Sequence, residues 1–431
     1  MKIRKNMRRM IICVLFVLPA LWVTGCDGNK RGEEVRQQEQ RIWESENVVL
    51  EFYTWSDEEN YVGQVVDAYN SLKGREAVRL HVIPNKLHGD WIKNYDGSIG
   101  ADILGLRGNR NLLELQNKGI LLDLRPYLQR GNLDVRGFGN MYNEIEYKGG
   151  YYGLPTRSSC WVLFYNKEIF DSQGIPYPGQ MTWEEYIQLS RKLTSGSGDG
   201  QVWGGYYPPW IFHMSAIQKG IYLLDDDLEP IRESLELTKR LYTSGSHMPY
   251  EEIADRSDDC RYDFGQGKTA MLISGEWMVN MLMEDEKSGL PVPDWDIAPL
   301  PVPEGVEEGT TAGMYQFAGI TSTCKYPEAA YEFLEFLCGE QGARIYARNA
   351  MIPGWTNEEI RQIYEEAVGD RNIDLFFETQ IVSEQPMWNR YDQLLELFKE
   401  DAELYMKNKI SLEEAMEDFE EKRKQIWRPE S

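Results

Sequence analysis

The sequence predicts an α/β protein whose chain crosses between two lobes, and a stretch near residue 160 carries much of this prediction. Residues 161–165, Trp-Val-Leu-Phe-Tyr, form an apolar run of strand-forming residues, which indicates a strand buried on both faces. Gly149 and Gly150 permit a turn before this run, and Asn166 begins a helical turn that ends near Gly174. A buried strand in this setting suits a passage from one lobe to another.

Strands and helices alternate before this stretch, as the α/β class requires. Residues 48–55 are apolar and β-branched and predict the first strand, while residues 56–72 predict a helix that stops at Gly74. Two more strands are expected at residues 78–83 and 100–106. When 25 N-terminal residues are removed as a leader, 406 of the 431 residues remain, which is enough for two lobes with sizeable cores.

The second half of the chain continues the alternation. Thr182 and Glu185 have the spacing of a capping box at the start of a helix. Residues 270–273 predict a buried strand, after which Trp277 begins a helix. Residues 295–301 predict a strand that ends at prolines, and we expect this strand to return the chain between the lobes.

A further helix is predicted to begin at Pro327, because proline is favoured in the first helical turn. Its apolar residues recur at helical spacing and are expected to face the core. They are Ala330, Phe333, Leu334 and Leu337. After a loop at residues 351–355, the rest of the chain is expected to be mainly helical.

The N-terminus has the order of a secretion signal. Residues 1–25 carry five basic residues and then an apolar run from Met10 to Val23, which is shorter than the roughly 20 apolar residues of a membrane-spanning helix. Val23-Thr-Gly-Cys26 resembles a lipobox, which implies lipidation of Cys26; the alternative is a buried cysteine at a chance position. Residues 26–46 are polar and charged and predict a flexible tether.

The charge of the chain excludes some partners. It has 70 acidic and 46 basic residues, a net charge of −24. Removal of residues 1–25, which hold five basic and no acidic residues, leaves 41 basic residues and a net charge near −29. This charge opposes binding to nucleic acid or to an anionic lipid surface, but it does not identify a ligand.

Several motifs together are similar to those of one protein family. They are Tyr152-Gly-Leu-Pro155, Tyr165-Asn-Lys167, Thr182-Trp-Glu-Glu185, Phe264-Gly-Gln-Gly-Lys-Thr-Ala-Met271 and Ile273-Ser-Gly-Glu-Trp277. Their order and spacing resemble the family 1 extracellular solute-binding proteins of ABC importers, a group that includes the maltose-binding proteins. The resemblance covers about residues 47–427, although Ala101 stands where the family strand has proline.

The resemblance implies a two-lobed periplasmic-binding-protein-like (type II) fold with hinge crossovers between the lobes. The expected division is a signal at residues 1–25, a tether at 26–46, an N-terminal lobe at 47–157 plus about 303–350, and a C-terminal lobe at 158–302 plus about 351–431. A monomer anchored by lipid to the extracytoplasmic face of the cell membrane would capture a carbohydrate, an oligosaccharide, by hinge closure. It would then deliver this ligand to ABC transporter permease subunits, without a cofactor, a metal or nucleic acid.

The candidate ligand-binding residues lie where strands end and helices begin, because loops at these points line a cleft between lobes. Sugars present apolar faces and a hydroxyl rim, so a site needs aromatic platforms and polar side chains. The candidate platforms are Trp55, Trp210, Trp277, Trp355 and Trp388. The candidate polar residues are Asp57, Arg107, Asn109, Tyr315 and Gln316, for which helix capping or surface solvation is the alternative.

Two other functions stay open. A secreted glycan-active enzyme would need two convergent carboxylates, and no pair can be singled out in so acidic a chain. The histidines His81, His88, His213 and His247 form no catalytic motif. The second open function is that of a receptor domain that binds ligand for a sensor kinase.

The disulfide state of the chain is also open. Four cysteines remain after the signal and Cys26, and they allow three disulfide pairings or none: Cys160, Cys260, Cys324 and Cys338.

Overall fold

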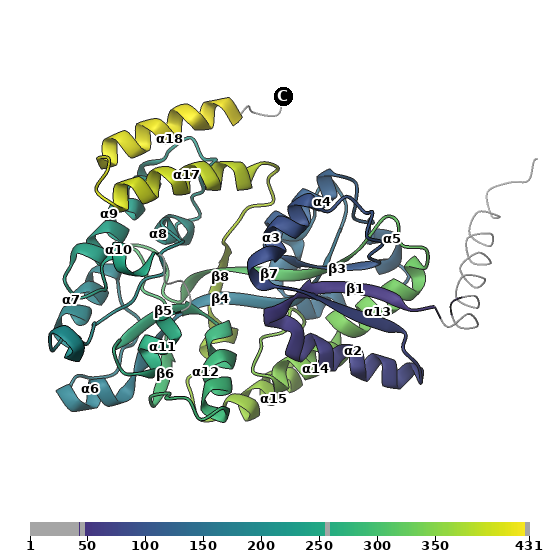
Figure 1. The fold of residues 1–431 in the computed structure, drawn as a ribbon, viewed down its shortest axis with the longest axis horizontal. Helices are drawn as coiled ribbons and strands as arrows, with labels where there is room; N and C mark the ends of the chain where they lie inside the picture. Colours follow the sequence, from purple (N-terminus) through teal and green to yellow (C-terminus); the bar gives the residue numbers. More distant parts are fainter. Residues whose placement is uncertain (1–42, 44–47, 255–258, 427–431) are drawn as a thin grey trace, which may run out of the picture. The chain divides into compact units, whose positions relative to one another are not determined.

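The computed structural model describes residue 43 and residues 48–254 and 259–426. The chain divides into two compact units, Met1–Glu46 and Asn47–Ser431. The fold described here is that of the second unit, which contains an eight-stranded sheet covered by helices (Figure 1).

The N-terminal predictions concern residues outside this description. The signal at residues 1–25, the lipidation of Cys26 and the tether at residues 26–46, apart from residue 43, all fall there. Within the described ranges, no helix has both the length and the apolar character needed to span a bilayer.

The strands follow the order β2-β1-β3-β7-β4-β5, with β6 paired to β4 and β8 paired to β7. Their bounds are β1 Leu50–Trp55, β2 Val78–Ile83, β3 Ile103–Arg107, β4 Leu154–Asn166, β5 Met271–Gly275, β6 Trp295–Ala298, β7 Thr310–Ile320 and β8 Gln380–Ser383. The strands predicted at residues 48–55, 78–83 and 100–106 are thus confirmed. β1 pairs in parallel with both β2 and β3, as expected when helices connect successive strands.

The sheet has one half that contains β1, β2 and β3 and another that contains β5 and β6. The strands β4 and β7 each pair in both halves. The first half of β4 pairs with β7, and its second half, from Trp161, pairs with β5 and β6. β7 pairs with β3 through residues 316–320 and with β8 through residues 310–313. The passage of the chain predicted near residues 161–165 therefore coincides with β4.

The return passage expected at residues 295–301 is wrong, because the return is made by β7. β6 has only four residues and pairs with β4, so it stays in the half that contains β5. At about 3.3 Å per residue, a strand of four residues is too short to serve both halves, whereas the eleven residues of β7 are long enough.

The helices surround the two halves of the sheet (Figure 1). Their bounds are α2 Glu59–Lys73, α3 Asn85–Asn94, α4 Gly108–Asn117, α5 Arg125–Leu128, α6 Lys167–Gln173, α7 Trp183–Leu193, α8 Met214–Gln218, α9 Glu229–Thr243, α10 Tyr250–Ile253, α11 Asp259–Gly265, α12 Trp277–Lys287, α13 Pro327–Cys338, α14 Glu340–Arg348, α15 Glu358–Val368, α16 Leu375–Glu378, α17 Tyr391–Met406 and α18 Leu412–Ile426. Short 3-10 turns lie at Ser56–Glu58, Val135–Phe138, Asn140–Ile145 and Gly198–Gly200.

Local side-chain chemistry sets several of these helix ends, as predicted. Thr182 and Glu185 form a complete capping box at the start of α7. The side chain of Asn166 accepts a hydrogen bond from the backbone N–H of Ile169 and caps α6. Gly74 ends α2 in the left-handed conformation, with φ of 65°, which glycine adopts without steric cost.

The helix α13 packs on the half of the sheet that contains β1. All four residues of its predicted apolar stripe are buried. The ring of Phe333 lies 5.8 Å from that of Phe52 on β1 and 5.0 Å from that of Tyr69 on α2. The chain after β7 therefore returns to the elements formed by its first residues.

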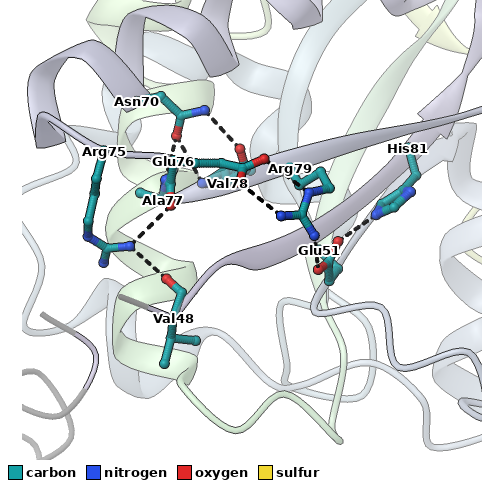
Figure 2. Close-up of polar contacts among 9 residues, drawn as sticks. All are labelled: Val48, Glu51, Asn70, Arg75, Glu76, Ala77, Val78, Arg79 and His81. Atoms are coloured by element: carbon teal, nitrogen blue, oxygen red, sulfur yellow. Dashed lines mark hydrogen bonds and ion pairs between the residues drawn. The ribbon is translucent and has the colours of Figure 1, made fainter. Parts of the chain in front are cut away.

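The edge of this half is tied together by polar side chains (Figure 2). The carboxamide of Asn70, near the end of α2, accepts from the N–H groups of Ala77 and Val78 at 2.8 and 2.9 Å, and it donates to the carbonyl of Val78. On β1, Glu51 accepts from Arg79 at 3.0 Å and lies 2.5 Å from the imidazole of His81. These contacts fix the start of β2 against α2 and β1.

Candidate ligand-binding site

The ends of the neighbouring parallel strands β1 and β3 bring two predicted site residues together. The guanidinium of Arg107 lies 4.8 Å from the centre of the Trp55 ring, a cation–π distance. His88 of α3 contacts the same ring at 5.0 Å between centroids. Trp55 packs against Arg107. Because its side chain is only 3% exposed, it offers little open surface to a ligand in this structure.

Arg107 and Asp57 are linked by a residue that the sequence analysis did not select. Nδ2 of Asn85 donates to Oδ2 of Asp57 at 2.5 Å, and Arg107 donates to Oδ1 of Asn85. Asn85 directly follows the end of β2 and Pro84, so the strand-end criterion that selected Asp57 and Arg107 also applies to it. A carboxylate, an amide and a guanidinium therefore meet at the ends of three strands, where they can donate to and accept from hydroxyl groups.

The electrostatic setting of Arg107 follows from its partial burial. Burial lowers the pKa of its guanidinium, and the negative charges of Asp57 and Glu58 oppose this effect. Asp57 is exposed and sits in the 3-10 turn after β1. Since a guanidinium stays protonated at any physiological pH, Arg107 supplies a fixed positive charge to this group.

The side chain of Asn109, the second residue of α4, is directed away from solvent. Its Nδ2 donates to the carbonyl of Gln385 at 2.6 Å. Two further contacts join α4 to the same region, namely Asn117 to Asn389 at 2.9 Å and Arg110 to Glu396 at 2.9 Å. Asn109 thus helps to hold α4 against the segment that leads into α17.

A cavity of about 360 Å³ lies between α4 and residues 385–393. Its walls include Arg110, Asn117, Lys93, Trp388, Asn389 and Gln393. Trp388 is the predicted platform that borders this cavity, where amide side chains and charged side chains of both signs accompany it. A volume of this size and a mixed aromatic and polar lining suit a small polar molecule.

Trp277 begins α12 beside the strand β4. Its ring meets that of Trp161 edge to face, with centroids 5.3 Å apart, and it is partly exposed. Gly275 lies under the ring, since a Cβ at that position would come within 1.9 Å of it. Trp161 in turn donates from Nε1 to Glu384 at 3.0 Å, so the strand β4 and the end of β8 hold the surroundings of Trp277 in place.

Tyr315 and Gln316 lie on β7 and are both buried. The hydroxyl of Tyr315 donates to the carbonyl of Phe138, which gives this group a structural partner. Gln316 faces Arg107 on β3 and Arg157 on β4 in the strand register. Its position beside Arg107 connects β7 to the polar group at the strand ends.

The two remaining predicted platforms differ sharply in their surroundings. Trp210 is 39% exposed in the loop before α8. Trp355 is buried, donates from Nε1 to the carbonyl of Asp134 at 2.7 Å, and lies on Gly137, where a Cβ would come within 2.1 Å of the ring. Trp355 therefore has a packing role in this structure, and contact of either residue with a ligand stays a prediction.

A pair of carboxylates does converge in the fold, but it is closed to solvent. Glu58 and Glu276 both lie against Arg157, at 3.4 and 3.0 Å. Both carboxylates are buried, so they offer no access to a glycosidic bond in this arrangement. Among the predicted histidines, burial lowers the pKa of His88 to about 4 and that of His213 and His247 to about 3, which keeps these imidazoles neutral.

Buried cysteines support a structural interpretation of two thiols. Cys160 on β4 and Cys338 at the end of α13 are free and buried. Burial raises the pKa of each thiol, and a thiol without thiolate character is unreactive.

The mixed α/β fold, in which two long strands pair in both halves of the sheet, matches the two-lobed fold of the sugar-binding protein MalE from Xanthomonas citri. The chain belongs to the bacterial extracellular solute-binding protein family, whose model matches residues 96–344. The predicted fold class and the family resemblance are both confirmed. Family and fold are those of extracytoplasmic binding proteins.

Individual relatives agree with this assignment. A galactooligosaccharide-binding protein of Bacillus subtilis (strain 168) is 24% identical over 330 residues, which cover 70% of this chain and 72% of that protein. The structure of an ABC substrate-binding protein from Listeria monocytogenes in complex with cycloalternan has a TM-score of 0.76 at 21% identity, covering 88% of this chain and 98% of that one. A sugar transporter from Rhizobium etli in an open conformation has a TM-score of 0.75 at 23% identity, covering 88% of this chain and 99% of that one.

Proposed function

We propose that this protein captures a carbohydrate, an oligosaccharide, at the extracytoplasmic face of the cell membrane and delivers it to the permease of an ABC transporter. The observation that carries the proposal is the cavity beside α4, where Trp388 stands among amide side chains and charged side chains of both signs. An aromatic ring can pack on the apolar face of a sugar while amides bind its hydroxyls. This ligand class is supported by two of the relatives, one named as a galactooligosaccharide-binding protein and the other solved in complex with cycloalternan.

Binding would proceed by closure of two lobes about their connections. We place the N-terminal lobe at residues 47–157 plus about 303–350 and the C-terminal lobe at 158–302 plus about 351–431. The double pairing of β4 and β7 supports crossovers of this kind. A ligand favours the closed state only through contacts that are stronger there than in the open state, so residues of both lobes are needed.

The chain would be held at the membrane by lipid on Cys26, with residues 26–46 as a tether. Two or more acyl chains give stable anchoring, whereas one chain gives only marginal binding. Metabolic labelling of the full chain with a clickable palmitate analogue, with Cys26→Ser as the control, tests this part. Label on the variant would refute lipidation at Cys26.

The ligand class is tested by calorimetric titration of residues 27–431, which include the whole compact unit from Asn47. A panel of mono- and oligosaccharides is titrated into the native chain and into Trp388→Ala. Loss of an aromatic platform is expected to weaken binding about tenfold. Trp91→Ala is the matched control, because Trp91 is also partly exposed but stacks on Tyr53 of β1.

The outcomes separate the open functions. Saturable binding that weakens in Trp388→Ala but not in Trp91→Ala supports carbohydrate capture at this cavity. Binding that is equal in both variants moves the site elsewhere. Conversion of a saccharide into product would replace the transport function with an enzymatic one, and binding to no member of the panel would reject the carbohydrate.

A further inference from the structure

A charged cluster lies buried where the chain passes between the halves of the sheet. Arg157 on β4 is 7% exposed, and Glu58 and Glu276 are 3% and 0% exposed. Nη1 of Arg157 donates to Oε1 of Glu276 at 3.0 Å, and its Nε lies 3.4 Å from Oε1 of Glu58. Two carboxylates therefore share one guanidinium away from solvent. We call these three residues the Arg157 cluster.

The members of the Arg157 cluster come from three separate segments of the chain. Glu58 belongs to the turn after β1, and Glu276 follows β5, where its backbone N–H donates to the carbonyl of Cys160 on β4 at 3.0 Å. Arg157 is bridged to Pro353 in the segment before α15. Any change in the relative positions of these three segments must therefore change the distances within the cluster.

Each carboxylate also neighbours a candidate ligand residue in the sequence. Glu58 directly follows Asp57, and Glu276 directly precedes Trp277. Because Glu276 is fixed to Arg157 by its side chain and to Cys160 by its backbone, it sets the point at which α12 and Trp277 begin. The cluster thus joins the turn of Asp57 to the platform of Trp277.

The charges of the cluster do not balance when both carboxylates are ionised. One guanidinium then faces two negative charges, and an unpaired buried charge is costly. Burial raises the pKa of Glu276 to about 7, with Glu58 adding to the rise and Arg157 opposing it. Burial also raises the pKa of Glu58, while Arg157 and Arg107 oppose that rise.

Other titratable groups packed around the cluster keep one charge state near neutral pH. They are Tyr61 on α2, Tyr346 on α14, Tyr364 on α15 and Cys160 on β4, together with Arg107 on β3. Burial raises the pKa of each tyrosine and of the thiol, so all four stay neutral between pH 6 and 8. Glu276, whose pKa burial raises to about 7, changes charge in this range.

We propose that Glu58, Arg157 and Glu276 form a positioning cluster that sets the orientation of Trp277 through protonation of Glu276, so that ligand binding depends on pH around neutrality. The step from Trp277 to ligand rests on the proposed function, whereas the control of Trp277 by the cluster does not. Protonated Glu276 leaves Arg157 paired with a single charged carboxylate and favours the arrangement described here. Ionised Glu276 repels Glu58 and displaces the start of α12.

The deciding experiment needs no ligand. Intrinsic tryptophan fluorescence of residues 27–431 is measured between pH 5 and 9 in the native chain, in Glu276→Gln and in Trp277→Phe. We expect a transition near pH 7 that both variants lose. Glutamine keeps the shape of the side chain and an oxygen that accepts from Arg157, so a loss of the transition reports protonation and not a failure to fold.

Two more variants test the coupling itself. Glu58→Gln removes the repulsion between the carboxylates and should move the transition to lower pH. His81→Gln removes a partly exposed imidazole on β2 that contacts Glu51, not the Arg157 cluster, and should leave the transition in place. A transition that is absent from the native chain, or that persists in Glu276→Gln, overturns the proposal.

Titration of the same panel of mono- and oligosaccharides at pH 6 and pH 8 then separates this proposal from the proposed function. Linkage to one proton predicts binding about threefold to tenfold weaker at pH 8 in the native chain and nearly equal at both values in Glu276→Gln. Equal pH dependence in both chains overturns the link to binding. A fluorescence transition without binding of any saccharide would support the cluster and reject carbohydrate as the ligand class.

Discussion

Substitution of Gly275 by alanine should displace the ring of Trp277 while Trp277 itself stays unsubstituted. Gly275 is the last residue of β5 and pairs with Trp161 on β4, so its backbone is held in the sheet. A Cβ there would lie 1.9 Å from the Trp277 ring, whereas carbon atoms in good contact are about 3.5–4.0 Å apart. The ring must therefore move by about 2 Å.

The cost of this movement can be estimated from the packing. Trp161 meets the Trp277 ring edge to face, so a shift of the ring disturbs this contact. Overpacking of this kind typically costs about 1–3 kcal/mol of folding free energy. If Trp277 is a sugar platform, Gly275→Ala should also weaken saccharide binding about tenfold, as expected for the loss of an aromatic contact.

Urea unfolding and calorimetric titration measure the two effects, and fluorescence emission reports the position of the ring. Gly63→Ala is the matched control, because nothing lies within 4 Å of its added Cβ on α2, and alanine in a helix interior is favoured over glycine by about 0.5–1 kcal/mol. Native stability, emission and affinity in Gly275→Ala would refute the reasoning. Loss of stability with unchanged affinity would remove Trp277 from the binding site.

Three further results are expected. The raised pKa of Glu276, about 7 against 4.5, means that the folded state binds a proton between these pH values that the unfolded state has released. The contribution of Glu276 to the unfolding free energy is therefore fully present below pH 4.5 and falls by about 3 kcal/mol as pH rises from 4.5 to above 7. The difference between urea titrations of the native chain and of Glu276→Gln measures this contribution, and the same pH dependence in both chains would contradict it. Phe333→Ala should cost about 3–5 kcal/mol, because the side chain is buried between Phe52 and Tyr69, and a cost below 1 kcal/mol in thermal unfolding would argue against this packing. Thr182→Ala removes one half of a capping box and should cost about 1 kcal/mol, whereas Thr182→Ser should restore stability, and a serine variant as unstable as the alanine variant would exclude a capping role.

The elements that the sequence predicted well are those that depend on nearby residues. The cap of α6 at Asn166, the capping box of α7 and the apolar stripe of α13 each involve side chains within a few turns of one another. The first three strands could be located because apolar, β-branched runs end at turn residues. Such local interactions are written in a contiguous segment, so a single sequence is enough to reveal them.

The candidate site was predicted only in part. Trp55, Asp57 and Arg107 were selected because they follow strands, and the parallel pairing of β1 with β3 brings their elements together. Asn85 satisfies the same criterion, but its role depends on its contacts with Asp57 and Arg107, more than 20 residues away in either direction. The burial of Trp355 on Gly137 joins positions 218 residues apart, and no local pattern signals it.

The sequence by itself determined the alternation of strands and helices, the caps, the family motifs and the excess of negative charge. Tertiary structure alone decided that β7 returns the chain, that Trp388 borders a cavity with α4, and that Glu58, Arg157 and Glu276 meet. The physical reason is that strand pairing and burial join segments far apart in the chain. A side chain's exposure, and with it the pKa of a group such as Glu276, is fixed only when those segments pack.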